Sequence, residues 1–68
     1  MLTPERIKEL ATRKNVKQIA VENFLSTLYP GDERSNTIDN LYMDAKMYKW
    51  NAATVKAIQI GVDEFFAK

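Results

Sequence analysis

The residue types that could carry out catalysis are few in this chain, and none of them forms a known catalytic set. Among 68 residues there is no cysteine and no histidine, which removes the thiolate nucleophile, the commonest general base and the commonest metal ligands. The hydroxyl groups of Ser26 and Ser35 therefore have no imidazole to activate them. The adjacent acids Asp32-Glu33 and Asp63-Glu64 are expected in a loop and near a helix end, where water solvates them. We expect no enzymatic activity, no metal ion and no cofactor.

A spacing pattern in residues 7–28 returns 34 residues later in the chain. It consists of a small residue on one helix, a turn followed by an apolar side chain, and two apolar positions that anchor a second helix on the first. The matching pairs are Ile7 and Leu41, Ala11 and Ala45, Val16 and Trp50, Val21 and Val55, Phe24 and Ile58, and Leu28 and Val62. This internal repeat predicts two helical hairpins in tandem, with Ala11 and Ala45 at equivalent helix–helix contacts.

In its spacing, the stretch 5–28 resembles the helix-turn-helix superfamily. The resemblance implies that Ala11 is the small packing residue, that Asn15 forms the turn, and that the following apolar residues are buried. It also implies a surface that meets duplex DNA, in which cations hold phosphates and amides read base edges. Its residues would be Arg13, Lys14, Lys17, Gln18, Glu22 and Asn23. The second copy presents Ala52, Ala53 and Lys56 outward, so we interpret it as scaffold.

The charge distribution allows DNA binding without requiring it. The net charge is +1, but residues 1–20 carry +3, residues 21–44 carry −4 and residues 45–68 carry +2. Nucleic-acid binders usually have a larger basic excess, because neutralised phosphates supply most of their affinity. A solvated surface of mixed charges explains the same distribution.

The aromatic and methionine content favours an alternative function, protein–protein interaction or self-association. Phe65 and Phe66 are about 100° apart on a helix and cannot both point inward equally. The apolar band of the expected second helix is also wider than one core face needs, which implies burial on two sides or a partner. Aromatic and Met side chains are favoured at protein interfaces. The alternative surface, on the third and fourth helices, consists of Met43, Met47, Tyr48, Phe65 and Phe66.

The elements that must position these residues are four short helices, so the predicted fold class is all-α. Thr3 and Pro4 start the first helix, and the second runs over 16–28 after a break at Asn15. The third begins at residue 36 or 37 and ends near Trp50, which we expect to be largely buried between the third and fourth helices. Asn51 caps the fourth helix, 52–67, in which Gly61 should permit a close approach. The domain would span 1–68, with a hairpin at 3–28, a loop at 29–36 and a hairpin at 37–67.

The apolar runs are short. None approaches the roughly 20 residues that a membrane span needs, and residues 1–6 lack the apolar region of a signal peptide. We therefore expect a soluble, cytoplasmic protein with no membrane partner and no small-molecule substrate. The predicted function is a small non-enzymatic binding module, whose partner is duplex DNA or, alternatively, a protein or a second copy of the chain.

Overall fold

The computed structural model describes residues 2–13 and 15–67, and these residues form four α-helices and no strand. The helices are α1 (Pro4–Ala11), α2 (Gln18–Ser26), α3 (Arg34–Tyr48) and α4 (Ala52–Phe66). The prediction of an all-α fold with four helices is confirmed. In the part of the chain that is described, no helix has both the length and the hydropathy needed to cross a bilayer.

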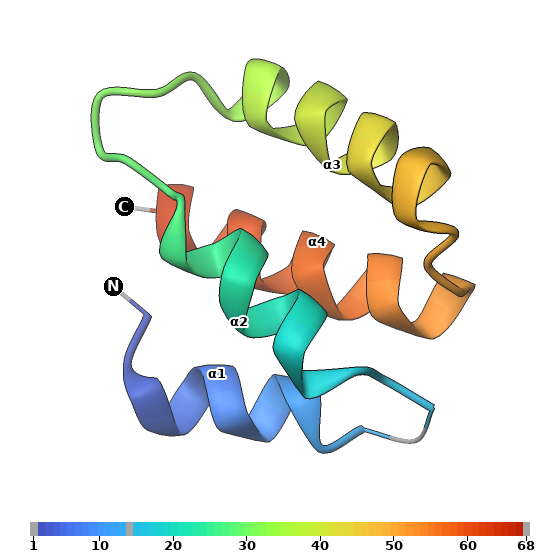
Figure 1. Ribbon diagram of the computed structural model, residues 1–68. Helices are drawn as coiled ribbons and strands as arrows, with labels where there is room; N and C mark the ends of the chain where they lie inside the picture. The colour runs from blue at the N-terminus through green and yellow to red at the C-terminus, as the bar shows by residue number, and fades with distance from the viewer. Residues whose placement is uncertain (1, 14, 68) are drawn as a thin grey trace.

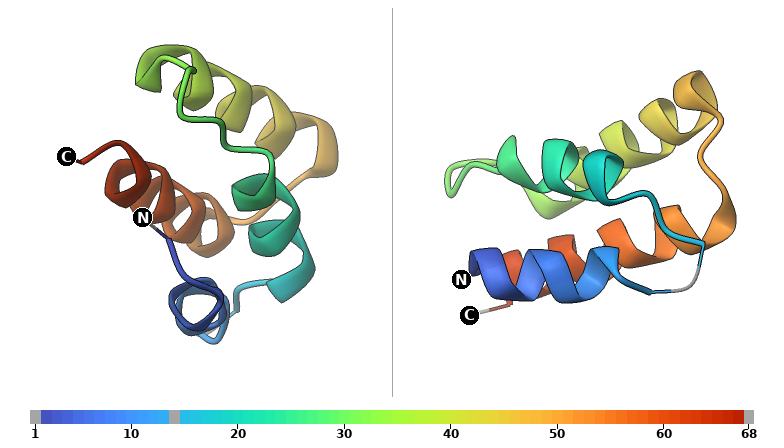
Figure 2. Two further views of the ribbon diagram at one scale, coloured as in Figure 1. Left: turned by 90° about the vertical axis from the view of Figure 1, so that its left-hand side faces the viewer. Right: turned by 60° about the horizontal axis from the view of Figure 1, so that its bottom comes forward.

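Helix α4 is the centre of the fold, because it packs against each of the other three helices. It lies between α3 on one side and α1 on the other, with α2 beside it (Figures 1 and 2). The α1–α2 and α3–α4 pairs also pack together, as two hairpins would. The core consists of Leu10, Ala11, Val21, Phe24, Leu25, Leu41, Ala57, Ile58 and Val62. Ala11 is buried whereas Ala45 is half-buried, and their equivalence stays a prediction.

The caps predicted for α1 and α4 are both present. The Thr3 side chain accepts a hydrogen bond from the N–H of Arg6 at 3.1 Å, and Pro4 occupies the first turn. The Asn51 side chain accepts from the N–H of Thr54 at 2.7 Å. Each cap satisfies a backbone donor that has no partner inside its helix.

Helix α2 is shorter than predicted, because the turn before it takes more residues. Asn15 has φ of 65°, the left-handed conformation that asparagine tolerates better than most residues. The chain is still extended at Lys17, which is the N-cap of α2 and makes no side-chain capping bond. The helix therefore begins at Gln18 instead of Val16, and it ends at Ser26 instead of Leu28.

Helix α3 begins earlier than predicted, at Arg34 instead of residue 36 or 37. The carbonyl oxygen of Glu33 accepts from both the N–H of Thr37 at 3.0 Å and its hydroxyl at 3.1 Å. At the other end, Lys49 has φ of 55°, and the N–H of Trp50 donates to the carbonyl of Ala45 at 3.0 Å. This left-handed residue reverses the chain so that α4 can pack on α3.

The acids Asp63 and Glu64 join α4 to its neighbours instead of being simply solvated. Arg6 of α1 donates from its Nε to Glu64 Oε2 at 2.9 Å, and Arg34 of α3 donates to Asp63 Oδ1 at 2.7 Å. The hydrogen bond from Arg6 holds the pKa of Glu64 below its usual range, although partial burial acts in the opposite direction. The two acids, which we expected to be solvated by water, therefore form ion pairs between helices.

Candidate functional site

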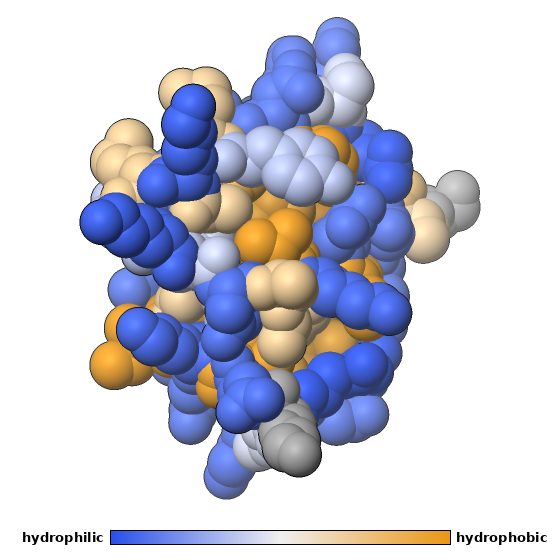
Figure 3. Space-filling model, turned by 90° about the vertical axis from the view of Figure 1, so that its right-hand side faces the viewer, coloured by the Kyte–Doolittle hydropathy of each residue, from blue (hydrophilic) through white to orange (hydrophobic). Residues whose placement is uncertain are grey.

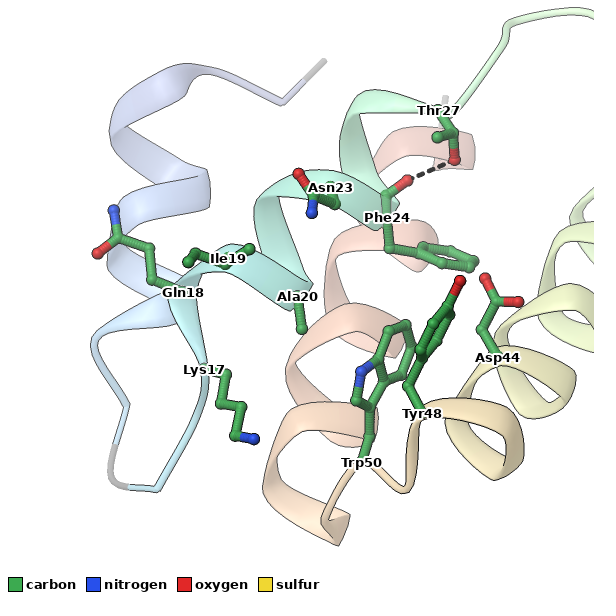
Figure 4. Close-up of a pocket in the computed structure, with 10 residues that line it drawn as sticks. All are labelled: Lys17, Gln18, Ile19, Ala20, Asn23, Phe24, Thr27, Asp44, Tyr48 and Trp50. Carbon is green, nitrogen blue, oxygen red and sulfur yellow. Dashed lines mark hydrogen bonds between the residues drawn. The ribbon is translucent and has the colours of Figure 1, made fainter.

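A groove separates α2 from the C-terminal half of α3. In the described residues α3 packs on α4 but has no comparable contact with α2, so the space between them stays open. The groove has a volume of about 890 Å³. Its walls and floor are formed by Lys17, Gln18, Ile19, Ala20, Asn23, Phe24, Thr27, Asp44, Tyr48 and Trp50 (Figure 4).

The floor of the groove is aromatic. The Trp50 ring packs edge-to-face on Phe24 of α2, with centroids 6.2 Å apart, and stacks on Tyr48 at 5.8 Å. We expected Trp50 to be largely buried between α3 and α4. It is instead half-buried in the turn before α4, where its ring packs on Phe24 of α2 (Figure 4). Phe24 is buried, whereas Tyr48 is 62% exposed.

The two ends of the groove carry opposite charges. Lys17, at the N-terminal end of α2, is exposed on the Trp50 side, and Asp44 lies on the other side of the aromatic cluster (Figure 4). A smaller hollow continues the groove beyond Asp44 and Thr27 and adds the carboxylate of Asp32. The groove is therefore cationic where α2 begins and acidic where α2 ends.

Apolar side chains also stand exposed around the groove. Ile19 on the α2 wall is 73% exposed, and Met43 and Met47 on α3 are 63% and 64% exposed. Figure 3 shows the face on which the α1–α2 and α3–α4 turns lie, with apolar side chains at its centre and hydrophilic ones around them. Many protein interfaces also have an apolar centre and a polar rim.

The residues predicted to contact DNA are exposed, with one outside the described part. Arg13 follows the end of α1, and Lys17, Gln18 and Asn23 line the groove together with Ile19. Gln18 donates from its Nε2 to Glu22 Oε1 at 2.9 Å, so these two side chains are paired with each other. Lys14 lies outside the described residues. DNA binding at this surface stays a prediction.

The residues predicted for a protein interface lie in two separate places. Met43, Met47 and Tyr48 are exposed on α3, and of these three Tyr48 lines the groove. Phe65 and Phe66 are both half-buried at the far end of α4, where their rings meet edge-to-face at 5.0 Å and Phe66 packs on the core. Ala20, Phe24, Asp44 and Trp50 line the groove but were not predicted to belong to a protein interface. The wide apolar band of the second helix was a signal for Ala20 and Phe24, whereas no signal in the sequence indicated Asp44 and Trp50.

The two turns near the groove are hydrogen-bonded to each other. Asn51 donates from its Nδ2 to the carbonyl oxygen of Asn15 at 2.7 Å, while its Oδ1 caps α4. A shallow hollow lies beside this bond and is lined by both turns. Asn51 thus fixes the start of α2 relative to the start of α4, and with it the cationic end of the groove.

Neither metal chemistry nor similarity assigns a function to this site. No cluster of three or more His, Cys, Asp or Glu side chains suited to a metal ion occurs within residues 2–13 and 15–67. No protein family, curated protein or solved structure gives a significant match to the chain.

Proposed function

We propose that this chain is a non-enzymatic binding module that receives an amphipathic helix of a protein in the groove between α2 and α3. The observation that supports this function is the aromatic floor of Phe24, Tyr48 and Trp50 between two helices that do not close on each other. Helix-in-groove recognition uses this geometry: apolar anchors at helical spacing enter an apolar trough between two rims.

The surroundings of the groove favour a protein helix over a small molecule. Ile19 on the α2 wall is exposed, and so are Met43 and Met47 on α3 outside the residues that line the groove, so a ligand confined to the groove floor would leave these apolar side chains in water. Methionine side chains adapt to partners of varied shape. The rim is polar on both walls, through Asn23 on α2 and Asp44 on α3.

Site-specific cross-linking tests this function. A photo-cross-linking amino acid replaces Ile19, which is exposed, and in a matched control it replaces exposed Glu5 on α1. We expect a protein adduct in the native cell from position 19 and none from position 5. The adduct should be lost when Ala20→Glu places a charge in the groove, in a variant shown by circular dichroism to remain helical.

The cross-linked segment of the partner should then bind the groove on its own. A synthetic peptide of the cross-linked segment should quench or shift the emission of Trp50, the single tryptophan. It should bind Ala20→Glu at least about tenfold more weakly. If position 19 yields no protein adduct, or if the peptide binds both forms equally, the groove is not the binding site.

Binding of duplex DNA is the second candidate, supported by the exposed positions of Arg13 and Lys17 on either side of the left-handed Asn15 turn. Contacts from Arg13, Lys14 and Lys17 to three phosphates would give log K a salt slope of about −2.7. We expect Arg13→Ala to weaken binding to all duplexes and to reduce that slope by about 0.9. Asn23→Ala should weaken binding only to preferred sequences. The measurement is a titration of labelled duplex at two salt concentrations, and absence of binding at low salt would exclude this candidate.

A further inference from the structure

We propose that the helix received by the groove is α2 of a second copy of this chain, in a two-fold symmetric dimer in which each α2 lies in the partner's groove. This inference rests on the proposed function, since it names the partner of the same groove. Three features of the described residues support it, and they concern shape, charge and helix capping.

The first feature is that α2 is both a wall of the groove and a ridge with an apolar tip. Ile19 is 73% exposed, whereas Val21, Phe24 and Leu25 of the same helix are buried in their own copy, so Ile19 is the large apolar side chain that α2 presents. A two-fold axis beside this wall would place α2 of each copy opposite the other copy's groove. Ile19 would then meet the aromatic floor of the partner, and one interaction would be made twice, as in isologous interfaces.

The second feature is that the charges of the groove are complementary to themselves under such an axis. The two α2 helices of the dimer run antiparallel, so the cationic end of one lies against the acidic end of the other. The partner's Lys17 then faces Asp44, and Lys17 faces the partner's Asp44. The phosphate backbone of a DNA duplex in the groove would instead meet the carboxylates of Asp44 and Asp32 at the acidic end.

The third feature is the open N-terminus of α2. Lys17 is its N-cap and forms no side-chain capping hydrogen bond; the same holds for Glu33 at α3, whereas Thr3 and Asn51 cap α1 and α4, and of the two uncapped starts only that of α2 lies at the groove. The first turn of a helix has free N–H groups and a partial positive charge. In the antiparallel dimer the partner's Asp44 carboxylate lies at this terminus and supplies the missing acceptor.

Charge reversal tests the dimer, because each reversal alone should weaken association, whereas the two variants should associate with each other when mixed. In Lys17→Glu the introduced carboxylate faces the partner's Asp44, and in Asp44→Lys the introduced ammonium group faces the partner's Lys17. Each variant should self-associate at least about tenfold more weakly than the parent. In an equimolar mixture of the two variants, both contacts of a heterodimer join opposite charges across the two-fold axis. A heterodimer should therefore form in preference to either homodimer.

The pairing in that heterodimer follows from the symmetry. One contact joins the two introduced groups, a carboxylate and an ammonium, and the other joins the unchanged Lys17 and Asp44 of the two chains. Both contacts are attractive, so the affinity of the heterodimer should be close to that of the parent. Ile19→Glu should give a monomer, because it removes the apolar tip without changing either charge pair.

Sedimentation equilibrium of the full chain measures the result against a protomer mass of 7.8 kDa. Lys8→Glu on α1 and Asp39→Lys on α3 are the matched controls, since neither position lines the groove. Circular dichroism checks that all variants remain helical.

Three outcomes would overturn the inference: a parent that stays monomeric at millimolar concentration, a mixture that fails to associate, or controls that weaken association equally. A monomeric parent that still forms an Ile19 adduct with a different protein would refute the dimer and keep the proposed function. An adduct with nucleic acid alone, and none with protein, would refute both.

Discussion

The Asn51 side chain forms hydrogen bonds through both of its polar atoms, one with the first turn of α4 and one with the turn before α2. Its Oδ1 accepts from the N–H of Thr54, and its Nδ2 donates to the carbonyl of Asn15, both at 2.7 Å. The acceptor role is that of any helix cap, and aspartate can perform it equally well. The donor role requires the amide, so the two functions can be separated by substitution.

We expect Asn51→Ala to lower the free energy of unfolding by about 1–2 kcal/mol, since it removes a cap and a hydrogen bond between turns. Asn51→Asp keeps the cap and loses only the bond to Asn15, so it should cost about 1 kcal/mol or less. Urea denaturation of the three proteins measures both effects. Equal losses in the two variants would mean that the cap contributes nothing.

At the scale of helices, Gly61 sets how closely α4 approaches α1 and α2. A Cβ atom added at this position would lie 2.8 Å from both Cδ atoms of Leu25 and 3.4 Å from Leu10 Cδ1. The first two distances are too short for carbon atoms in contact, and Leu25 is itself buried. Leu25 would have to shift to admit a Cβ atom here, so packing favours Gly61, although it lowers intrinsic helix stability by about 1 kcal/mol relative to alanine.

A double-mutant cycle tests this packing. Gly61→Ala alone should destabilise the protein by about 1 kcal/mol, because an overpacking cost of about 1–3 kcal/mol exceeds the gain in helix propensity. In a Leu25→Ala background the clash is absent, and Gly61→Ala should instead stabilise by about 0.5–1 kcal/mol. Thermal or urea unfolding of the four proteins gives the coupling energy. The same effect in both backgrounds would show that Leu25 is not the obstacle.

The elements that follow from local chemistry were predictable from the sequence, and those set by distant contacts were not. The starts of α1 and α4 depend on Thr3 and Asn51, whose capping bonds span three residues. Helix α3 begins at Arg34, whose side chain forms an ion pair with Asp63, 29 residues later in the chain. A pattern read along the chain does not contain that pairing.

The candidate site depends even more on tertiary structure. The exposure of Lys17, Met47 and Tyr48 agrees with their assignment to surfaces from sequence. In the described residues the groove exists because α3 packs on α4 and makes no comparable contact with α2. The hydrophobic periodicity of the sequence does not indicate this arrangement. The position of Trp50 at the groove also depends on tertiary structure, because its ring packs on Phe24 of α2.

At the scale of the whole molecule, ion pairs at one end of α4 connect it to α1 and α3. The Arg6 and Glu64 side chains are 28% and 38% exposed, so solvent screens their interaction only in part. Because the pKa of Glu64 is lower in the folded state, the pair stabilises the fold above the unfolded value of about 4.3. That stabilisation is lost as the pH falls through the lower folded value.

We therefore expect the urea midpoint of the parent to fall more steeply below about pH 4.3 than that of Glu64→Gln. Arg6→Gln should flatten the same acid limb, and the double variant should resemble either single one, because all three lack the same pair. The measurement is a series of urea unfolding curves from acid to neutral pH. An unchanged acid limb in Glu64→Gln would assign the acid sensitivity to other carboxylates.

The central position of α4 also has a consequence for the order in which the protein acquires its structure. Of the four helices, α4 is the last in the chain, yet it supplies Ala57, Ile58 and Val62 to the core and contacts each of the other three. While the chain emerges from a ribosome, α1 and α2 have each other to pack on, but α3 meets its main partner only when α4 is available. The core closes only after Ala57, Ile58 and Val62 have left the exit tunnel, and until then the apolar faces of the earlier helices stay accessible to chaperones.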